Sequence, residues 1–168
     1  MAETDTAPPH SWTTRAEQPG DAPALRELLL AAFPTAHEAD LVDALREDPS
    51  AWIDGLSTVA LEEGRIVSHA LLTRADVGGE PVLALAPCAT LPQRQGRGAG
   101  SAAIRAALDA ARSAGESLVV VLGHPGYYPR FGFVPASSLG VTAPFDVPDE
   151  AFLALPLDAP QRFLRHPG

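Results

Sequence analysis

The spacing of apolar residues predicts two helices near the start of the chain. Asp21-Ala22-Pro23 is typical of a helix start, and apolar side chains follow at helical spacing until Phe33-Pro34. A second helix is expected after Thr35, which forms a capping-box pattern with Glu38, and it stops before Asp48-Pro49. The apolar stripes of the two helices consist of Leu25, Leu28, Leu29 and Ala32, and of Leu41, Ala44 and Leu45.

The pattern then changes to the short apolar runs that are typical of strands. Residues 59–61 and 65–73 predict a hairpin around Glu62-Glu63-Gly64. Residues 82–91 are apolar at nearly every position, which predicts a third strand that is buried on both faces. Because Pro87 cannot donate a hydrogen bond to a neighbouring strand, we expect a bulge or a break in pairing there.

A strand–turn–helix–strand unit completes the predicted core. The helix covers residues 101–114, with Ile104, Leu108 and Ala111 buried and Gly115 as its C-terminal cap, and a strand follows at 117–122. Further strand pieces are expected at 11–15, 139–142 and 152–157. This order predicts a mixed α/β sheet with at least one parallel crossover, in one domain spanning residues 1–168 with a flexible tail over 1–10.

Composition narrows the classes of protein that this fold can serve. The formal net charge is −9 and the chain has no lysine, which argues against binding to nucleic acids or to anionic membranes. Residues 1–18 have no apolar run, so we expect no signal peptide, and no run reaches the roughly 18 apolar residues that a membrane helix needs. The lone Cys88 cannot form an internal disulfide. We therefore expect a cytoplasmic protein.

The glycine-rich turn before the third predicted helix is a candidate phosphate site. Free N–H groups and the helix dipole at such a junction attract phosphate. Glycines at 96, 98 and 100 do not fit the dinucleotide fingerprint G-x-G-x-x-G, and a Walker A loop needs a lysine. The acyl-CoA pyrophosphate pattern Q/R-x-x-G-x-G/A fits at Gln95, Gly98 and Gly100. The alternative is a glycine turn without a ligand.

About thirty residues later the chain reads Tyr127-Tyr128-Pro129-Arg130-Phe131-Gly132-Phe133, directly after a strand and Gly123-His124-Pro125. Together with the glycine turn, this run resembles the GNAT superfamily of N-acetyltransferases, and most closely its bacterial YhbS-like branch. Members of that branch carry a similar L-G-[HD]-P-x-Y-Y-x-R-F-G-F run. The likeness covers about residues 12–157 and is densest over 83–135.

The resemblance implies a mixed, mostly antiparallel sheet whose central strands splay apart to admit the pantetheine arm of acetyl-CoA. It implies an acetyl-CoA-dependent N-acetyltransferase acting on a primary amine of a small molecule or a protein, and it allows a homodimer. Arg94 and Arg97 would add charge near the pyrophosphate. The implied cofactor-binding residues are Cys88, Ala89 and Thr90 for the acetyl and pantetheine groups, and Gln95, Gly96, Arg97, Gly98, Ala99, Gly100 and Ser101 for the pyrophosphate.

Tyr128 stands four residues before Gly132-Phe133, where the family carries a tyrosine. A neutral phenol can protonate the departing thiolate, so Tyr128 is the predicted general acid; the alternative is a core aromatic. We expect Tyr127 to be a core or substrate-side neighbour. The general base stays open among Glu38, Asp40, Glu62, Glu63, His124 and a water chain, with His69 as a further candidate.

The same residues bear on covalent catalysis, on metal binding and on functions other than catalysis. A covalent role for Cys88 is rejected, because no acid or His is recognisably paired with it and a buried strand would raise its pKa. No metal is expected, since His37 and Asp40 form only a loose i, i+3 pair. A non-catalytic acyl-CoA-binding module stays open, whereas a purely structural dimerisation domain leaves the glycine turn unexplained.

Overall fold

The computed structural model describes residues 12–143 and 146–157. Its helices are α1 (Ala22–Ala32), α2 (His37–Arg46) and α3 (Ala99–Ser113), with short 3₁₀ turns that include η2 (Pro92–Arg94), η3 (Tyr128–Phe131) and η4 (Ala136–Leu139). The strands are β2 (Thr13–Ala16), β3 (Ser57–Glu62), β4 (Arg65–Val77), β5 (Glu80–Thr90), β6 (Leu118–Leu122), β7 (Val134–Pro135) and β8 (Phe152–Pro156).

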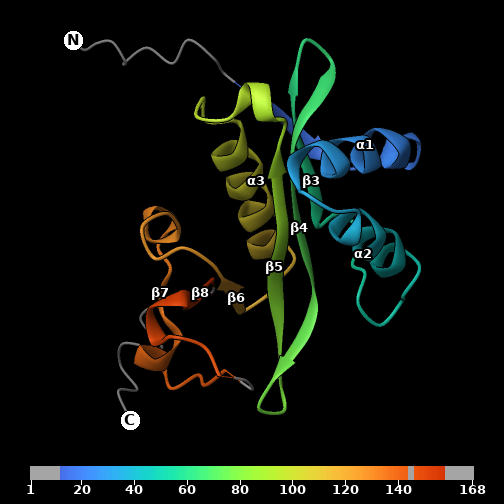
Figure 1. The fold of residues 1–168 in the computed structure, drawn as a ribbon. Helices are drawn as coiled ribbons and strands as arrows, with labels where there is room; N and C mark the ends of the chain where they lie inside the picture. The colour runs from blue at the N-terminus through green and yellow to red at the C-terminus, as the bar shows by residue number, and fades with distance from the viewer. Residues whose placement is uncertain (1–11, 144–145, 158–168) are drawn as a thin grey trace, which may run out of the picture.

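The seven strands form one sheet in the order β2-β3-β4-β5-β6-β8-β7. Every neighbouring pair is antiparallel except β5 and β6, which run parallel on either side of the α3 crossover. Figure 1 shows α3 on one face of the sheet and α1 and α2 on the other. The predicted mixed, mostly antiparallel sheet is confirmed.

The predicted apolar stripes of α1 and α3 face the sheet, but the stripe predicted for α2 is wrong: Ala39 and Val42 are its buried residues, whereas Leu41 is 37% exposed. Ile104, Leu108 and Ala111 of α3 are buried against one face together with Phe133. On the other face the cluster beneath α1 and α2 consists of Leu25, Leu28, Leu29, Ala39, Val42, Val59, Leu71 and Ala89. Alternate residues of β4 therefore face different helices, as strand geometry requires.

The sheet splits between β5 and β6. These strands pair only at Leu83↔Val119 and Ala84↔Val120. Beyond Ala84, the edge of β5 that faces β6 has no strand partner among the described residues. On its other edge β5 stays paired with β4, with a register shift around Pro87. The bulge expected at this proline is confirmed.

Two other local predictions were wrong. Residues 139–142 are not a strand: η4 ends at Leu139, Gly140 turns the chain with φ +77°, and Val141 N–H bonds back to the Ala136 carbonyl. Thr35 is not the N-cap of α2, which begins at His37 after Ala36; the Thr35 hydroxyl instead accepts a 3.3 Å bond from the His37 N–H. Glu38 thereby sits too early in the helix to complete a capping box.

The remaining boundaries move by only a few residues. The first strand starts at Thr13 rather than at 11, and α3 begins at Ala99, two residues earlier than expected. The expected tail over residues 1–10 lies outside the described residues. Among those that are described, no helix combines the length and the apolar content needed to cross a bilayer.

Gly132 offers a test of how the fold positions the segment after β6. It ends η3 with φ +102°, and an added Cβ would lie 3.1 Å from Leu155 Cδ1. We expect Gly132→Ala to lower the free energy of unfolding by about 1–2 kcal/mol, because an L-residue avoids this conformation. Gly20→Ala is the control, since its Cβ would have no neighbour within 4 Å. Equal urea midpoints for the two variants would contradict the assignment.

Candidate functional site

The glycine turn gives α3 an open N-terminus. Gly96 and Gly98 adopt φ of +79° and +92°, which lets the chain turn sharply from η2 into the helix. Gly98 is the N-cap, and its carbonyl accepts the Ala102 N–H at 2.9 Å. Helix geometry leaves the N–H groups of the first turn without intrahelical acceptors, and the N-cap Gly98 has no side chain to cap them. This end of α3 is therefore suited to an anion.

Contacts with three other segments fix the turn in place. The Trp12 indole N–H donates to the Arg97 carbonyl at 3.0 Å, a contact that sequence reasoning missed. Gln95 folds back so that its amide donates to the Thr90 carbonyl at 3.4 Å. Arg94 forms a 2.5 Å ion pair with Glu62, whereas Arg97 is exposed. Of the two arginines expected to add charge, only Arg94 is paired with a carboxylate in the part of the chain that the structure describes.

The floor of the turn is a tight cluster of hydroxyl groups. A Cβ on Gly100 would lie 2.9 Å from Thr90 Oγ1, so glycine is needed for this close approach. Ser68 Oγ donates to the Ala89 carbonyl at 2.8 Å and lies 2.8 Å from Thr90 Oγ1. The cluster ties β4 and β5 to the start of α3.

Tyr127 joins the segment after β6 to the same helix. Its hydroxyl lies 3.0 Å from Ser101 Oγ in the first turn of α3. Arg130 lies over its ring, with Cζ 4.3 Å from the centroid, and donates from Nε to the Tyr127 carbonyl at 2.8 Å. Tyr127 therefore belongs to the α3 end of the site, a position that its sequence did not reveal.

Tyr128 points the other way, toward the split in the sheet. Its ring lies directly on Gly123, where a Cβ would come within 2.8 Å of Cδ2. Edge-to-face contacts with Tyr127 and Phe133, at 5.0 and 5.9 Å between centroids, hold the ring. Its hydroxyl faces the Cys88 thiol on β5. The structure thus brings together the predicted acid and the predicted acetyl-binding strand.

Burial keeps both of these groups protonated. It raises the pKa of the Cys88 thiol to about 12, and the Tyr128 hydroxyl only partly offsets that effect. Burial also raises the pKa of Tyr128 above its usual value, with a further contribution from Cys88. A neutral thiol agrees with the rejection of Cys88 as a nucleophile.

Several candidates for the general base are engaged elsewhere. Glu62 pairs with Arg94, and Asp40 pairs with Arg26 at 2.9 Å. Glu63 is exposed in the turn between β3 and β4. His124 Nδ1 accepts the Gly126 N–H at 3.0 Å, so this nitrogen is already engaged within its own loop.

The other two candidates lie on the face covered by α1 and α2. Glu38 is in the first turn of α2 with its Oε1 atom buried. His69 lies on β4 and is only 1% exposed, and its Nε2 is 2.8 Å from Ser57 Oγ. The described part of the chain forms no group of three or more His, Cys, Asp or Glu side chains able to hold a metal ion.

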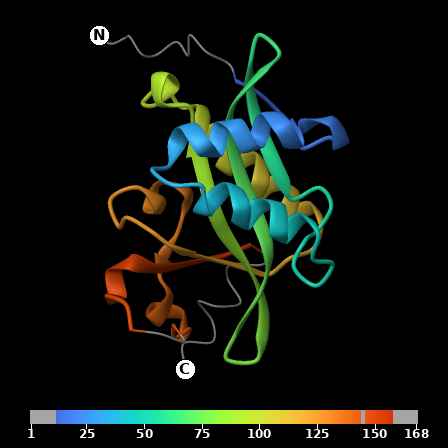
Figure 2. The ribbon, with the colours of Figure 1, turned by 45° about the vertical axis from the view of Figure 1, so that its right-hand side comes forward.

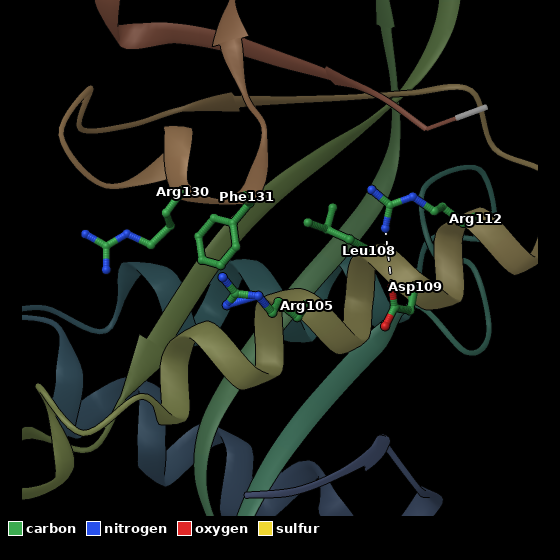
Figure 3. Close-up of a pocket in the computed structure, with 6 residues that line it drawn as sticks. All are labelled: Arg105, Leu108, Asp109, Arg112, Arg130 and Phe131. Carbon is green, nitrogen blue, oxygen red and sulfur yellow. Dashed lines mark hydrogen bonds and ion pairs between the residues drawn. The ribbon is translucent and has the colours of Figure 1, made fainter. Parts of the chain in front are cut away.

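A separate pocket of about 250 Å³ lies between α3 and η3 (Figure 3). The Arg105 guanidinium lies against the Phe131 ring, with Cζ 4.9 Å from its centroid. Arg112 is held by Asp109 on the same helix at 3.3 Å. The contact between Arg105 and Phe131 joins the segment that carries Tyr128 to α3. Its lining consists of Arg105, Leu108, Asp109, Arg112, Arg130 and Phe131.

This fold and this site define an acetyltransferase. Residues 22–133 match the model of the acetyltransferase (GNAT) family, and the chain belongs to that family, as the resemblance predicted. It is 43% identical over 146 residues to the uncharacterized N-acetyltransferase YjhQ of Escherichia coli K12, covering 84% of this chain and 80% of YjhQ. It is 35% identical over 121 residues to the uncharacterized N-acetyltransferase YhbS of the same strain, covering 71% of each chain.

Two solved structures share the architecture. The crystal structure of Escherichia coli YhbS in complex with CoA superposes with a TM-score of 0.79 at 31% identity, covering 87% of this chain and 81% of that one. A GNAT acetyltransferase from Brucella melitensis in complex with acetyl-CoA gives a TM-score of 0.71 at 33% identity, covering 88% of each chain. The predicted family, fold and enzyme class are confirmed.

The environment of Cys88 can be tested directly, because the chain has a single cysteine. With a pKa of about 12, roughly one thiol in ten thousand is ionised at pH 8, against about one in four for an ordinary cysteine. We expect Cys88 in the folded protein to react with Ellman's reagent at least about tenfold more slowly than in urea, because its thiolate is scarcer although more nucleophilic. The rate should rise steadily with pH above 8. Equal rates for folded and unfolded protein would contradict the structure.

Proposed function

We propose that the protein binds acetyl-CoA between β5 and β6 and transfers the acetyl group to a primary amine of a small molecule or a protein. One observation carries the proposal. The unpaired edge of β5 runs from the Tyr128 hydroxyl, facing Cys88, to the open N-terminus of α3. The CoA and acetyl-CoA complexes of two structural relatives support this choice of cosubstrate.

The cosubstrate would meet different chemistry at each end of this groove. The pantetheine arm would use backbone groups on the free edge of β5, and the pyrophosphate would receive the N–H groups at the start of α3. Arg97 is exposed beside the turn and would add positive charge. The proposed binding residues are Cys88, Ala89 and Thr90 on β5 and Gln95, Gly96, Arg97, Gly98, Ala99, Gly100 and Ser101 at the turn.

The reaction proposed is direct attack of the amine on the thioester carbonyl. A backbone N–H group on the free edge of β5 would stabilise the oxyanion. The C–S bond then breaks, and Tyr128 donates its phenolic proton to the departing sulfur. The uncharged state of Tyr128 keeps that proton available at neutral pH.

Cys88 indicates what this environment does to a thiolate. Its pKa of about 12 arises mainly from burial, and a CoA sulfur beside Tyr128 would be destabilised as an anion for the same reason. Burial therefore raises the affinity of the leaving sulfur for a proton along with that of the phenol. Proton transfer from Tyr128 becomes feasible although its own pKa is raised.

The alternative is a non-catalytic acyl-CoA-binding module with the same fold. The position of Tyr128 favours the enzyme, because a binder has no use for a proton donor at the sulfur. Release of free CoA from acetyl-CoA in the presence of a panel of amines separates the two functions. We further propose that the whole chain, residues 1–168, forms one acetyltransferase domain.

Ligand binding provides the first test. At a hundredfold excess over the dissociation constant, acetyl-CoA should stabilise the protein by about 2.7 kcal/mol. ATP and NADH lack the pantetheine arm and should raise Tm much less.

Gly98→Val should weaken CoA binding in calorimetry, because its side chain blocks backbone approach to phosphate. Gly115→Val is the matched control, since Gly115 has a similar φ of +82° but lies at the other end of α3. Unchanged affinity in folded Gly98→Val would refute the pyrophosphate assignment.

Tyr128→Phe tests the general acid. It keeps the ring that packs on Gly123 and removes only the hydroxyl, so kcat should fall by roughly 10²–10⁴-fold with acetyl-CoA affinity within a few-fold. Tyr127→Phe removes the hydroxyl that contacts Ser101 and should reduce kcat far less. Both are measured by CoA release with an amine found active in the panel. Wild-type turnover in folded Tyr128→Phe would assign the acid role to water.

A further inference from the structure

Three buried polar atoms mark the interface between α2 and the sheet. Within the described residues, Glu38 Oε1, Arg46 Nη2 and His69 Nδ1 are the buried side-chain atoms without a hydrogen-bond partner. Glu38 and Arg46 lie on α2, and His69 lies two residues from Leu71 on β4, so it shares the face covered by α1 and α2. Leaving such a group unsatisfied is unfavourable, which favours a role for these atoms.

His69 is the first member of a chain of short hydrogen bonds. Ser57 Oγ donates to Glu17 Oε1 at 2.6 Å, which uses the only hydroxyl proton. The 2.8 Å contact between Ser57 Oγ and His69 Nε2 must then be donated by the imidazole. This assigns the tautomer with hydrogen on Nε2 and leaves a free lone pair on Nδ1. Glu17 is held in turn by Arg46, whose Nε donates to Oε2 at 2.9 Å.

These hydrogen bonds run across the strands on the face covered by α1 and α2, from β4 next to β5 toward β2. His69 pairs with Ala89, one of the residues proposed to bind the acetyl group. The next members of the hydrogen-bond series are Ser57 on β3 and Glu17 just after β2. Figure 2 shows α2 lying across these strands, with its first turn nearer β5 and its last turn nearer β3. Glu38, in that first turn, carries a second buried acceptor without a partner among the described residues.

The Glu17 end of this series of hydrogen bonds opens to solvent. Glu17 and Ser57 line a surface pocket of about 380 Å³, together with Arg46 and Trp52. The Arg46 guanidinium lies over the Trp52 ring, with Cζ 5.2 Å from its centroid, which fixes the cation beside Glu17. A proton that reaches Glu17 can therefore pass to water.

On the basis of the acetyl transfer proposed above, we propose that His69, Ser57 and Glu17 form a proton relay that carries the proton of the acceptor amine away from the acetyl site. As the amine N–H bond breaks, its proton passes through a bridging water to His69 Nδ1. The Nε2 proton moves to Ser57 Oγ, and the Ser57 proton moves to Glu17 Oε1. The carboxylate becomes a carboxylic acid and then releases the proton to solvent in the pocket.

The electrostatics of His69 suit a group that passes a proton without keeping it. Burial, and then the charge of Arg46, lower the pKa of His69 to about 3, so the imidazole is neutral at neutral pH. Because Nδ1 accepts one proton while Nε2 donates another, the His69 ring does not stay positively charged. The relay also supplies the general base that the sequence left open.

Ser57→Ala breaks the relay at its centre. We expect kcat for amine acetylation to fall by about 100-fold, in the range of general acid–base effects, while acetyl-CoA affinity stays within about twofold. Ser57→Thr restores a hydroxyl and should recover kcat to within a few-fold of wild type. Thr58→Val is the matched control: it removes a buried hydroxyl that bonds the Ala103 carbonyl at 2.8 Å on the opposite face, so it should lower Tm but not kcat.

Two further measurements keep the outcome decisive. Glu17→Gln still accepts the Ser57 hydrogen bond but takes up no proton, so it should reproduce the loss of kcat if Ser57→Ala does not fold. Nitrogen-15 NMR of the wild-type ring should show a neutral His69 with hydrogen on Nε2 from pH 5 to 8. Wild-type kcat in folded Ser57→Ala or Glu17→Gln, or hydrogen on Nδ1, would overturn the relay. Absence of CoA release by the wild-type protein with every amine would instead overturn the acetyl transfer itself, and the relay with it.

Discussion

The arrangement of the site depends on the early separation of two parallel strands. β5 and β6 share two residue pairs and then diverge, which exposes one edge of β5 in the middle of the sheet. Backbone N–H and C=O groups need partners, so such an edge favours a ligand that can pair like a strand. Everything else is arranged around it: the open end of α3 lies at one end of the groove, Tyr128 lies beside it, and α1 and α2 cover the adjoining strands.

The groove also has a distinct electrostatic character. At the turn, backbone N–H groups and Arg97 favour negative charge, whereas beside Tyr128 burial keeps both a thiol and a phenol neutral. One end of the groove therefore favours an anionic group, whereas the other end disfavours negative charge and holds protonated side chains. The chain as a whole carries a net charge of −9, so this local pattern is independent of the overall balance.

The sequence could predict the parts of the site that depend on local pattern. The glycine spacing at 96, 98 and 100, the position of Tyr128 before Gly132-Phe133 and the break at Pro87 are all visible along the chain. The contacts from Trp12 to Arg97 and from Tyr127 to Ser101 join segments far apart, and only the folded structure reveals them. His69 appeared as one polar residue in a strand, because its link to Ser57 depends on strand register. The strand predicted at residues 139–142 does not form, because Gly140 adopts a left-handed backbone conformation that turns the chain.

Trp12 has a consequence for how the protein can be observed. Its indole donates to the Arg97 carbonyl and lies 3.5 Å from the position of a Cβ on Gly98, so one of the two tryptophans reports on the glycine turn. The other, Trp52, lies against Arg46 on the opposite side of the sheet. The intrinsic fluorescence of the chain therefore has one emitter at the turn and one beside Glu17. The glycine turn and the pocket beside Glu17 can thus each be followed by the fluorescence of a native tryptophan, without chemical modification.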